Sequence, residues 1–335
     1  MDLGVLAPRP LRRRGVFALA LAGLAAAQAR GAMAANEAWP TQPVRYVNLF
    51  PPGGATDIMS RIYCNKMSEL AGQQFVVENR AGAGGTVGQA AIAHAAPDGY
   101  TVGLGSVASL AVAPSLYPSL PYDPAKDFTF VSGIWKVPNL LICNNNLPAR
   151  SLAELVALVR ANPGKFVYGS GGSGTTPHLT MELFKQVAGL DVIHAPYRGG
   201  APALVDLMGG RIQMMFDNVP TVIGAVRDGK VRALAVTSTS RSEALPDVPT
   251  MAESYPDFEI TSWGGLVGPA GMPNRAVEKL SALTRRALQD PGLIRLFAEN
   301  GATTWWTTPE DFATFRTVQE TLFARLVRAS GARVD

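Results

Sequence analysis

The chain has 335 residues, of which 47% are hydrophobic and 17% are charged, and its formal net charge is +4. This composition is typical of a globular protein and excludes a disordered or fibrous chain. Residues 1–34 hold five arginines and one aspartate, and the rest of the chain carries equal numbers of acidic and basic side chains. The basic balance therefore gives no support for nucleic acid binding, and we expect no nucleic acid partner.

The N-terminal segment has the three-part layout of a secretory signal peptide. Arg12, Arg13 and Arg14 precede an apolar run over 16–27, which small residues follow. We expect residues 1–34 to be a cleaved export signal. A membrane anchor is the alternative, but the run is short for one. Whether export uses the general or the twin-arginine route stays open, and the residues beside the arginines fit the second poorly.

The first strand-to-helix turn of the exported chain is rich in glycine. An apolar strand pattern over Val44–Phe50 leads into Gly53 and Gly54, and a helical pattern follows with Met59 and Tyr63 on one face. Glycines let the backbone approach a ligand closely. A helix N-terminus offers unpaired N–H groups and positive potential, so the turn predicts an anion site.

Strand and helix patterns then alternate along the chain. Further strands are predicted at Phe75–Glu78, Tyr100–Leu104, Asn139–Cys143, Phe166–Gly169, Val192–Ala195, Ile212–Phe216 and Ala233–Thr237. Helices are predicted over Gly85–Ala95, after a capping box at Ser151 and Glu154, over Leu179–Val187, and between the last three of these strands. Two more are predicted near the C-terminus, one through Val277 and Ala287 and one from Thr308-Pro309 with Phe312, Phe315, Leu322 and Leu326. This alternation indicates an α/β fold with parallel-rich sheets and flanking helices.

Two α/β sets occur in one chain, and the C-terminal helices lack predicted strands of their own. The simplest arrangement packs those helices on the first set. We therefore expect residues 35–134 and 262–335 to form a discontinuous first lobe, residues 135–261 to form a second lobe, and two crossing segments to act as the hinge.

A second glycine-rich turn lies in the second set. It runs from Gly169 to His178, again between a strand and a helix, and supplies the hydroxyls of Ser173, Thr175 and Thr176. Either turn alone could be a flexible loop. Two such turns, one in each set, favour a ligand cleft with facing helix N-termini.

Catalytic and metal-binding patterns are weak. The G-x-G-x-x-A pattern at 103–108 follows the third strand, whereas a dinucleotide-binding fold carries it after the first strand of its unit. No Gly-Lys-Ser/Thr follows the glycine-rich turns, so a P-loop is not predicted. The G-x-S-x-G elbow of serine hydrolases does not occur around Ser170 and Ser173. The carboxylates Asp57, Glu78 and Asp217 form no evident acid/base pair. We therefore expect no enzyme and no cofactor.

The histidines and cysteines are widely spaced. His94, His178 and His194 form no cluster of the kind that holds a metal ion, so we expect none. Cys64 and Cys143 could pair in an exported protein, but nothing in the sequence brings them together, and two separate thiols are favoured.

Through a series of short motifs in the same order, the chain resembles the periplasmic solute-binding receptors of tripartite tricarboxylate transporters, which are called the Bug family. The resemblance covers nearly the whole exported chain and rests on residues 53–57, 78–85, 96–101, 172–178, 196–200, 206–210, 245–250 and 263–266. It implies a two-lobed type II periplasmic binding fold, of the Venus-flytrap kind. It also implies a periplasmic monomer that passes a small organic acid to transporter membrane subunits.

By that resemblance, each glycine-rich turn holds one side of a ligand carboxylate through backbone N–H groups and water. The implied ligand residues are Gly53, Gly54, Ala55, Thr56 and Asp57 on the first lobe, Ser173, Gly174, Thr175, Thr176 and His178 on the second, and also Ser106 and Asp217. Ala55 lacks a hydroxyl that many relatives carry, which leaves the ligand open among dicarboxylates, tricarboxylates, amino acids and aromatic acids. A carboxylate sensor that signals to a membrane kinase, or an enzyme acting on a carboxylate, remain alternatives.

Overall fold

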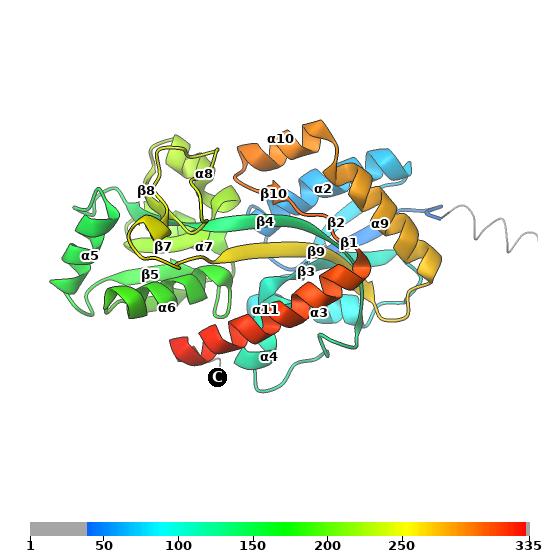
Figure 1. The fold of residues 1–335 in the computed structure, drawn as a ribbon, viewed down its shortest axis with the longest axis horizontal. Coiled ribbons are helices and arrows are strands. Elements are labelled where there is room, and N and C mark those ends of the chain that lie inside the picture. The colour runs from blue at the N-terminus through cyan, green and yellow to red at the C-terminus, as the bar shows by residue number, and fades with distance from the viewer. Residues whose placement is uncertain (1–38, 333–335) are drawn as a thin grey trace, which may run out of the picture. The chain divides into compact units, whose positions relative to one another are not determined.

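The computed structural model describes residues 39–332, of which residues 42–332 form one compact unit (Figure 1). The predicted signal peptide lies outside the described residues. Within the part that is described, no helix combines the length and the apolar character needed to cross a membrane.

The first part of the sheet is built around three parallel strands (Figure 1). β1 (Val44–Asn48) lies between β2 (Phe75–Asn79) and β3 (Thr101–Ser106). β9 (Thr261–Pro269) pairs antiparallel with β3 and with the long strand β4 (Phe128–Asn144), and the short β10 (Thr303–Thr304) also pairs with β4. The carboxyl ends of β1 and β3 therefore meet at one edge, where ligands of open α/β sheets bind.

The second part of the sheet grows from the far end of β4. The pairing partner of β4 changes from β9 to β7 (Met214–Asn218) between Pro138 and Asn139, and β8 (Val231–Val236) also pairs with this end. β5 (Val167–Ser170) runs parallel to β7 and to β6 (Ile193–Pro196). β4 thus joins two groups of parallel strands in one sheet, in the two-lobed arrangement that the resemblance implies.

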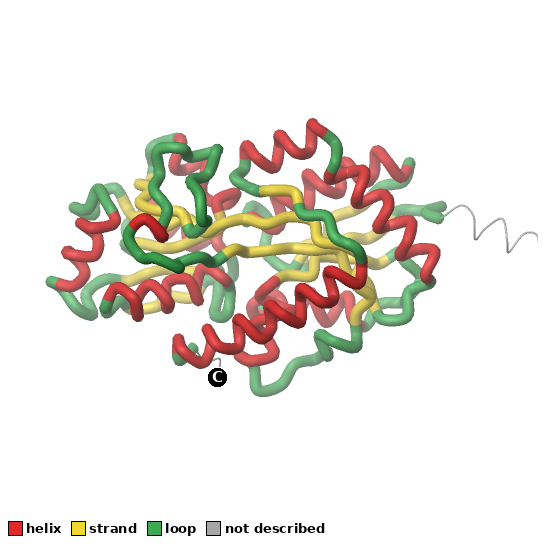
Figure 2. Tube along the Cα trace, viewed as in Figure 1, coloured by secondary structure: helices red, strands yellow, loops and turns green. Residues whose placement is uncertain are grey.

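Helices cover both parts of the sheet (Figure 2). Their bounds are α2 (Ala55–Ala71), α3 (Thr86–Ala93), α4 (Ala113–Leu116), α5 (Leu152–Arg160), α6 (Thr176–Ala188), α7 (Gly200–Met208), α8 (Val219–Arg227), α9 (Asn274–Leu288), α10 (Pro291–Glu299) and α11 (Pro309–Ser330). α9 and α10 pack against α2, whereas α11 contacts both β4 and α6. The last helix therefore touches elements on both parts of the sheet.

Apolar side chains of the helices pack under the sheet where the sequence patterns predicted them. Met59, Tyr63 and Met67 of α2 are fully buried. In the second part, Phe184 of α6 meets the ring of Phe216 edge-on, with ring centroids 6.0 Å apart. Burial of side chains of this size contributes about 1.5–3 kcal/mol each, which fixes the helices whose first turns form the site.

All eight predicted strands are confirmed, but β9, β10, α4 and α10 were not predicted. β9 contains Gly264, Gly265 and Gly268, which weaken a strand pattern. A Cβ on Gly264 would lie 2.4 Å from the Trp135 ring, and one on Gly265 would lie 2.2 Å from the Phe312 ring. These glycines therefore let bulky rings pack directly on the strand backbone.

The predicted apolar face of the last helix was partly wrong. Phe312 is buried as predicted, but Leu322 is 48% exposed, and Phe323 and Val327 are buried instead. The predicted start is confirmed, because the Thr308 hydroxyl accepts a hydrogen bond from the Asp311 N–H at 3.1 Å.

Candidate functional site

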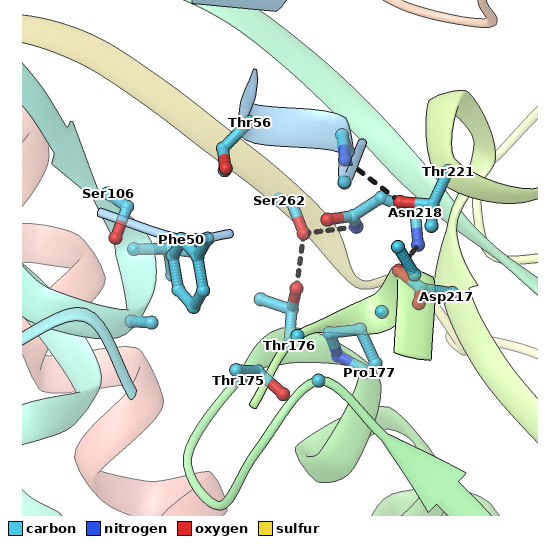
Figure 3. Close-up of a pocket in the computed structure, with 18 of the residues that line it drawn as sticks. Phe50, Thr56, Ser106, Thr175, Thr176, Pro177, Asp217, Asn218, Thr221 and Ser262 are labelled. Atoms are coloured by element: carbon cyan, nitrogen blue, oxygen red, sulfur yellow. Dashed lines mark hydrogen bonds between the residues drawn. The ribbon is translucent and has the colours of Figure 1, made fainter. Parts of the chain in front are cut away.

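A cavity of about 600 Å³, including its opening to solvent, lies where four helices begin (Figure 3). The first turns of α2, α6, α7 and α8 all contribute residues to its wall. Each helix N-terminus carries a partial positive charge and unpaired N–H groups. Large apolar side chains complete the wall, namely those of Phe50, Trp135 and Trp263.

The cavity brings together residues from both glycine-rich turns. Of the residues expected at the site, those in its wall are Gly54, Ala55, Thr56, Ser106, Thr175, Thr176 and Asp217. Gly53, Asp57, Ser173, Gly174 and His178 are not in the wall. The contacts of Asp57 and His178 show what these two side chains do instead.

Asp57 holds the first turn together. Its carboxylate accepts hydrogen bonds from the Gly53 N–H at 3.0 Å and from Asn79 Nδ2 at 2.9 Å, and it pairs with Arg61 at 2.9 Å. Burial alone would raise the pKa of Asp57, but the hydrogen bonds from Arg61, Gly53 and Asn79 lower it overall. An ionised Asp57 therefore fixes the backbone from which α2 begins.

His178 holds the second turn in the same way. Its Nδ1 accepts a hydrogen bond from the Gly174 N–H at 3.1 Å, four residues earlier, as Asp57 does for Gly53. The His178 ring stacks on His194 with ring centroids 4.2 Å apart. Burial lowers the pKa of His178 to about 4, so the ring is neutral at physiological pH and can accept this bond.

Asp217 is the only ionisable side chain among the described residues in the cavity wall. It is 4% exposed, and its Oδ1 accepts the N–H of Asn218 at 2.7 Å. Burial raises the pKa of Asp217 to about 7, against the lowering effects of the Asn218 N–H that donates to it and of the neighbouring Thr221 hydroxyl.

The Ser262 hydroxyl lies between the side chains of Thr176 and Asn218 in the cavity wall (Figure 3). It is hydrogen-bonded to the Thr176 hydroxyl and accepts from Asn218 Nδ2 at 2.7 Å. Asn218 Nδ2 also donates to Asn139 Oδ1 on β4 at 2.6 Å. This network ties the first turn of α6 to β4 and β9, at the place where the two parts of the sheet meet.

Several wall residues were not among the expected site residues. Those with large or polar side chains are Phe50, Trp135, Asn218, Thr221, Ser262 and Trp263. Trp263 lies in a motif that carried the resemblance, Phe50 ends the first predicted strand, and Asn218 directly follows the expected site residue Asp217, so their position in the sequence was a usable signal. Thr221 and Ser262 have no such signal, because their place depends on how α8 and β9 pack.

The chemistry of the wall fits reversible binding of a small anion. The described wall residues include hydroxyls, helix N–H groups and aromatic rings, but no lysine, arginine or histidine. Ser170 Oγ lies 2.7 Å from His194 Nε2, yet neither residue lines the cavity, and Ser170 is fully buried.

Comparison with known proteins shows which family the chain belongs to. Residues 59–331 match the family described as tripartite tricarboxylate transporter family receptor. The chain belongs to this family. Among relatives of the receptor, protein BugT of Bordetella pertussis is 38% identical over 322 residues, which cover 96% of this chain and 97% of BugT.

Solved structures resemble the receptor over most of its length. One is Rpa4515 of R. palustris with adipate, with a TM-score of 0.86 and 34% identity, covering 88% of this chain and all of that one. Another is MatC of Rhodopseudomonas palustris with bound malate, with a TM-score of 0.81 and 31% identity, covering 86% of this chain and all of that one. The fold is therefore that of a two-lobed periplasmic binding protein.

Proposed function

We propose that the protein is a periplasmic receptor that holds a small organic carboxylate in the cavity and delivers it to the membrane subunits of a tripartite tricarboxylate transporter. The convergence of four helix N-termini on one cavity carries this proposal. Their combined positive potential and free N–H groups suit an anion without a dedicated arginine or lysine. The adipate and malate bound by two relatives are anions of this kind.

The side chains of the cavity wall favour ligand binding over catalysis. The aromatic and proline side chains of the wall suit a hydrocarbon chain or ring, and the hydroxyls suit its polar ends. A carboxylate held by N–H groups is stabilised, but no wall residue pairs a nucleophile with a base. We infer a receptor that binds and releases its ligand unchanged.

Ligand capture would use movement of two lobes. We propose that residues 35–134 and 262–335 form one lobe and residues 135–261 the other. The change of strand partner at Pro138 and Asn139 supports a hinge in β4 close to the inferred boundary. Closure would exclude water from the cavity and strengthen each polar contact with the ligand.

The proposal is tested by thermal unfolding with a panel of monocarboxylates, dicarboxylates, tricarboxylates and amino acids. A ligand present at a hundred times its Kd stabilises the folded state by about 2.7 kcal/mol, so a cognate acid will raise the Tm clearly. Mass spectrometry of the same samples should recover the acid unchanged. A Tm that no carboxylate moves would contradict the proposal, and conversion of the acid to a product would show an enzyme.

A further inference from the structure

Asp217 indicates which class of carboxylate the cavity takes, an inference that rests on the proposed function. The Asp217 side chain is almost fully buried in the cavity wall. Its Oδ1 accepts the Asn218 N–H, but its Oδ2 has no hydrogen-bond partner. Buried carboxylate oxygens normally have partners, so this oxygen calls for one that a ligand supplies.

The residues around Asp217 are arranged to admit this carboxyl group. Gly200 is the first residue of α7, and a Cβ on it would lie only 1.9 Å from Asp217 Oδ2. A glycine is therefore required at this position for the carboxyl group to lie where it does. Thr221, on the first turn of α8, is the hydroxyl neighbour that lowers the pKa of Asp217.

No positive side chain compensates for Asp217 in the cavity. The elements that form the wall present hydroxyls, amides, glycines, prolines and apolar groups, and none of their described wall residues is cationic. The first turns of α7 and α8 favour the ionised form through their positive ends. A cationic or hydrogen-bond-donating group of the ligand is the partner that the protein itself lacks.

The opposite side of the cavity is chemically different. In Figure 3, Thr56 and Ser106 lie on one side of the cavity, and Asp217 and Thr221 lie on the other. Thr56 Oγ1, in the first turn of α2, is also buried without a partner. Hydroxyl and N–H groups suit a ligand carboxylate on that side, so the two sides are complementary to two different groups of one ligand.

We propose that Asp217 is a specificity-determining residue whose free oxygen accepts a hydrogen bond from a hydroxyl or ammonium group of the ligand. The receptor then prefers hydroxy-acids or amino acids over carboxylates of the same skeleton without such a group. An unsubstituted acid leaves Asp217 Oδ2 buried and unpaired, and also places a second negative charge near it. We expect the unsubstituted acid to bind about tenfold or more weakly.

The test uses sets of acids that share a skeleton. The sets are succinate, malate and aspartate; adipate, 2-hydroxyadipate and 2-aminoadipate; and phenylacetate, mandelate and phenylglycine, each chiral acid in both enantiomers. Kd values are measured by titration calorimetry at neutral pH on the wild-type receptor. Within the set that binds, the hydroxy- or amino-acid should be about tenfold or more tighter than the unsubstituted acid.

Variants then assign the preference to Asp217. Asp217→Ala should abolish it for both substituents, whereas Asp217→Asn keeps an acceptor oxygen and should abolish only a preference for ammonium. Asp247→Asn is the matched control, because Asp247 is exposed and lies outside the cavity wall, and it should keep the wild-type ratios. If a variant does not fold, the wild-type ratios still decide the question.

Each remaining outcome counts against the inference. Unsubstituted acids that bind as tightly as their substituted analogues would overturn it while leaving carboxylate binding intact. Asp217→Ala that keeps the wild-type ratios would show that another group sets the preference, which also overturns it. A panel in which no acid binds would refute the proposed function together with this inference.

Discussion

The backbone N–H of Ala55 donates a hydrogen bond of 2.9 Å to the hydroxyl of Thr221, across 166 positions of sequence. Ala55 is the first residue of α2, which follows β1, and Thr221 lies on α8, which follows β7. The bond therefore joins the first glycine-rich turn to the second part of the sheet directly beside the cavity (Figure 3). Within the proposed two lobes, it is a contact that closure makes and opening breaks.

Replacing Thr221 by valine keeps the shape of the side chain and removes this acceptor. The Ala55 N–H then has no partner in the closed form, and a lost hydrogen bond of this kind costs about 1 kcal/mol. We expect Thr221→Val to weaken ligand binding about fivefold, as measured by titration calorimetry. The loss should appear mainly as faster ligand release, because the closed form is the one destabilised.

Thr221→Ser is the control for this prediction, since it keeps the hydroxyl. Its affinity should stay close to that of the wild type. Equal affinities for the valine and serine variants would show that the bond between Ala55 and Thr221 does not contribute to closure.

The second prediction concerns the Gly174 N–H, which only a correctly placed acceptor at position 178 satisfies. His178→Leu removes the acceptor and leaves a buried N–H unpaired, which costs about 1–3 kcal/mol. We expect faster amide hydrogen exchange over residues 172–176 and weaker ligand binding. His178→Asn retains an oxygen near the position of Nδ1 and should keep more of the protection.

Exchange in the turn, rather than Tm, decides this prediction, because both variants also lose the ring that stacks on His194. If His178→Asn and His178→Leu exchange equally fast at Gly174, the hydrogen bond does not hold the turn. The same logic applies to Asp57, whose carboxylate accepts the Gly53 N–H in the first turn.

Local patterns were enough to predict most of the fold. The apolar face of α2, the caps at Ser151 and Thr308 and the short β-branched strands are all encoded by neighbours in sequence. β9 could not be predicted in this way. Its glycines are explained only by the Trp135 and Phe312 rings that pack on them from distant parts of the chain.

The candidate site was predictable at its turns and not beyond them. Glycines between a strand and a helix mark where a backbone can meet an anion, and these positions border the cavity. The sequence does not show that Asp57 and His178 point back at their own turns, because that depends on side-chain direction. Nor does it show Thr221 or Ser262, which reach the cavity through the packing of α8 and β9.

The third prediction concerns the stacked pair of His178 and His194. Burial lowers the pKa of both rings, to about 4 for His178 and about 3 for His194, whose pKa the neighbouring His178 lowers further. In the unfolded chain each titrates near about 6.5. The unfolded state therefore binds more protons between these values, and the free energy of unfolding falls as the pH drops from about 6.5 to 4.

His194→Phe keeps a ring for Tyr168 and His178 to stack on and removes one titrating group. It also loses the contact between Ser170 Oγ and His194 Nε2, so it is less stable at pH 7. We expect its free energy of unfolding to fall by about 2–3 kcal/mol less than that of the wild type between pH 7 and pH 4. Denaturant unfolding at a series of pH values measures this, and parallel curves for the two proteins would contradict it.

The fourth prediction gives Asp217 the opposite pH dependence. Burial raises its pKa to about 7, whereas an aspartate in the unfolded chain titrates near about 3.9. The folded, ligand-free receptor then holds a proton that the unfolded chain has released, so this group costs stability as the pH rises from about 4 to 7. Asp217→Asn removes the cost, and its stability relative to the wild type should increase by a few kcal/mol over that range.

Asp57→Asn is the control for the Asp217 experiment, because hydrogen bonds hold the pKa of Asp57 below its ordinary value. Asp57 stays ionised in both states over most of the range from pH 5 to 8, so its replacement should lower stability by a nearly constant amount there. Denaturant unfolding of the three proteins without ligand separates the two cases. If the difference in free energy of unfolding between Asp217→Asn and the wild type does not change with pH, Asp217 is already ionised at low pH. The first turns of α7 and α8 would then stabilise its charge more strongly than burial disfavours it.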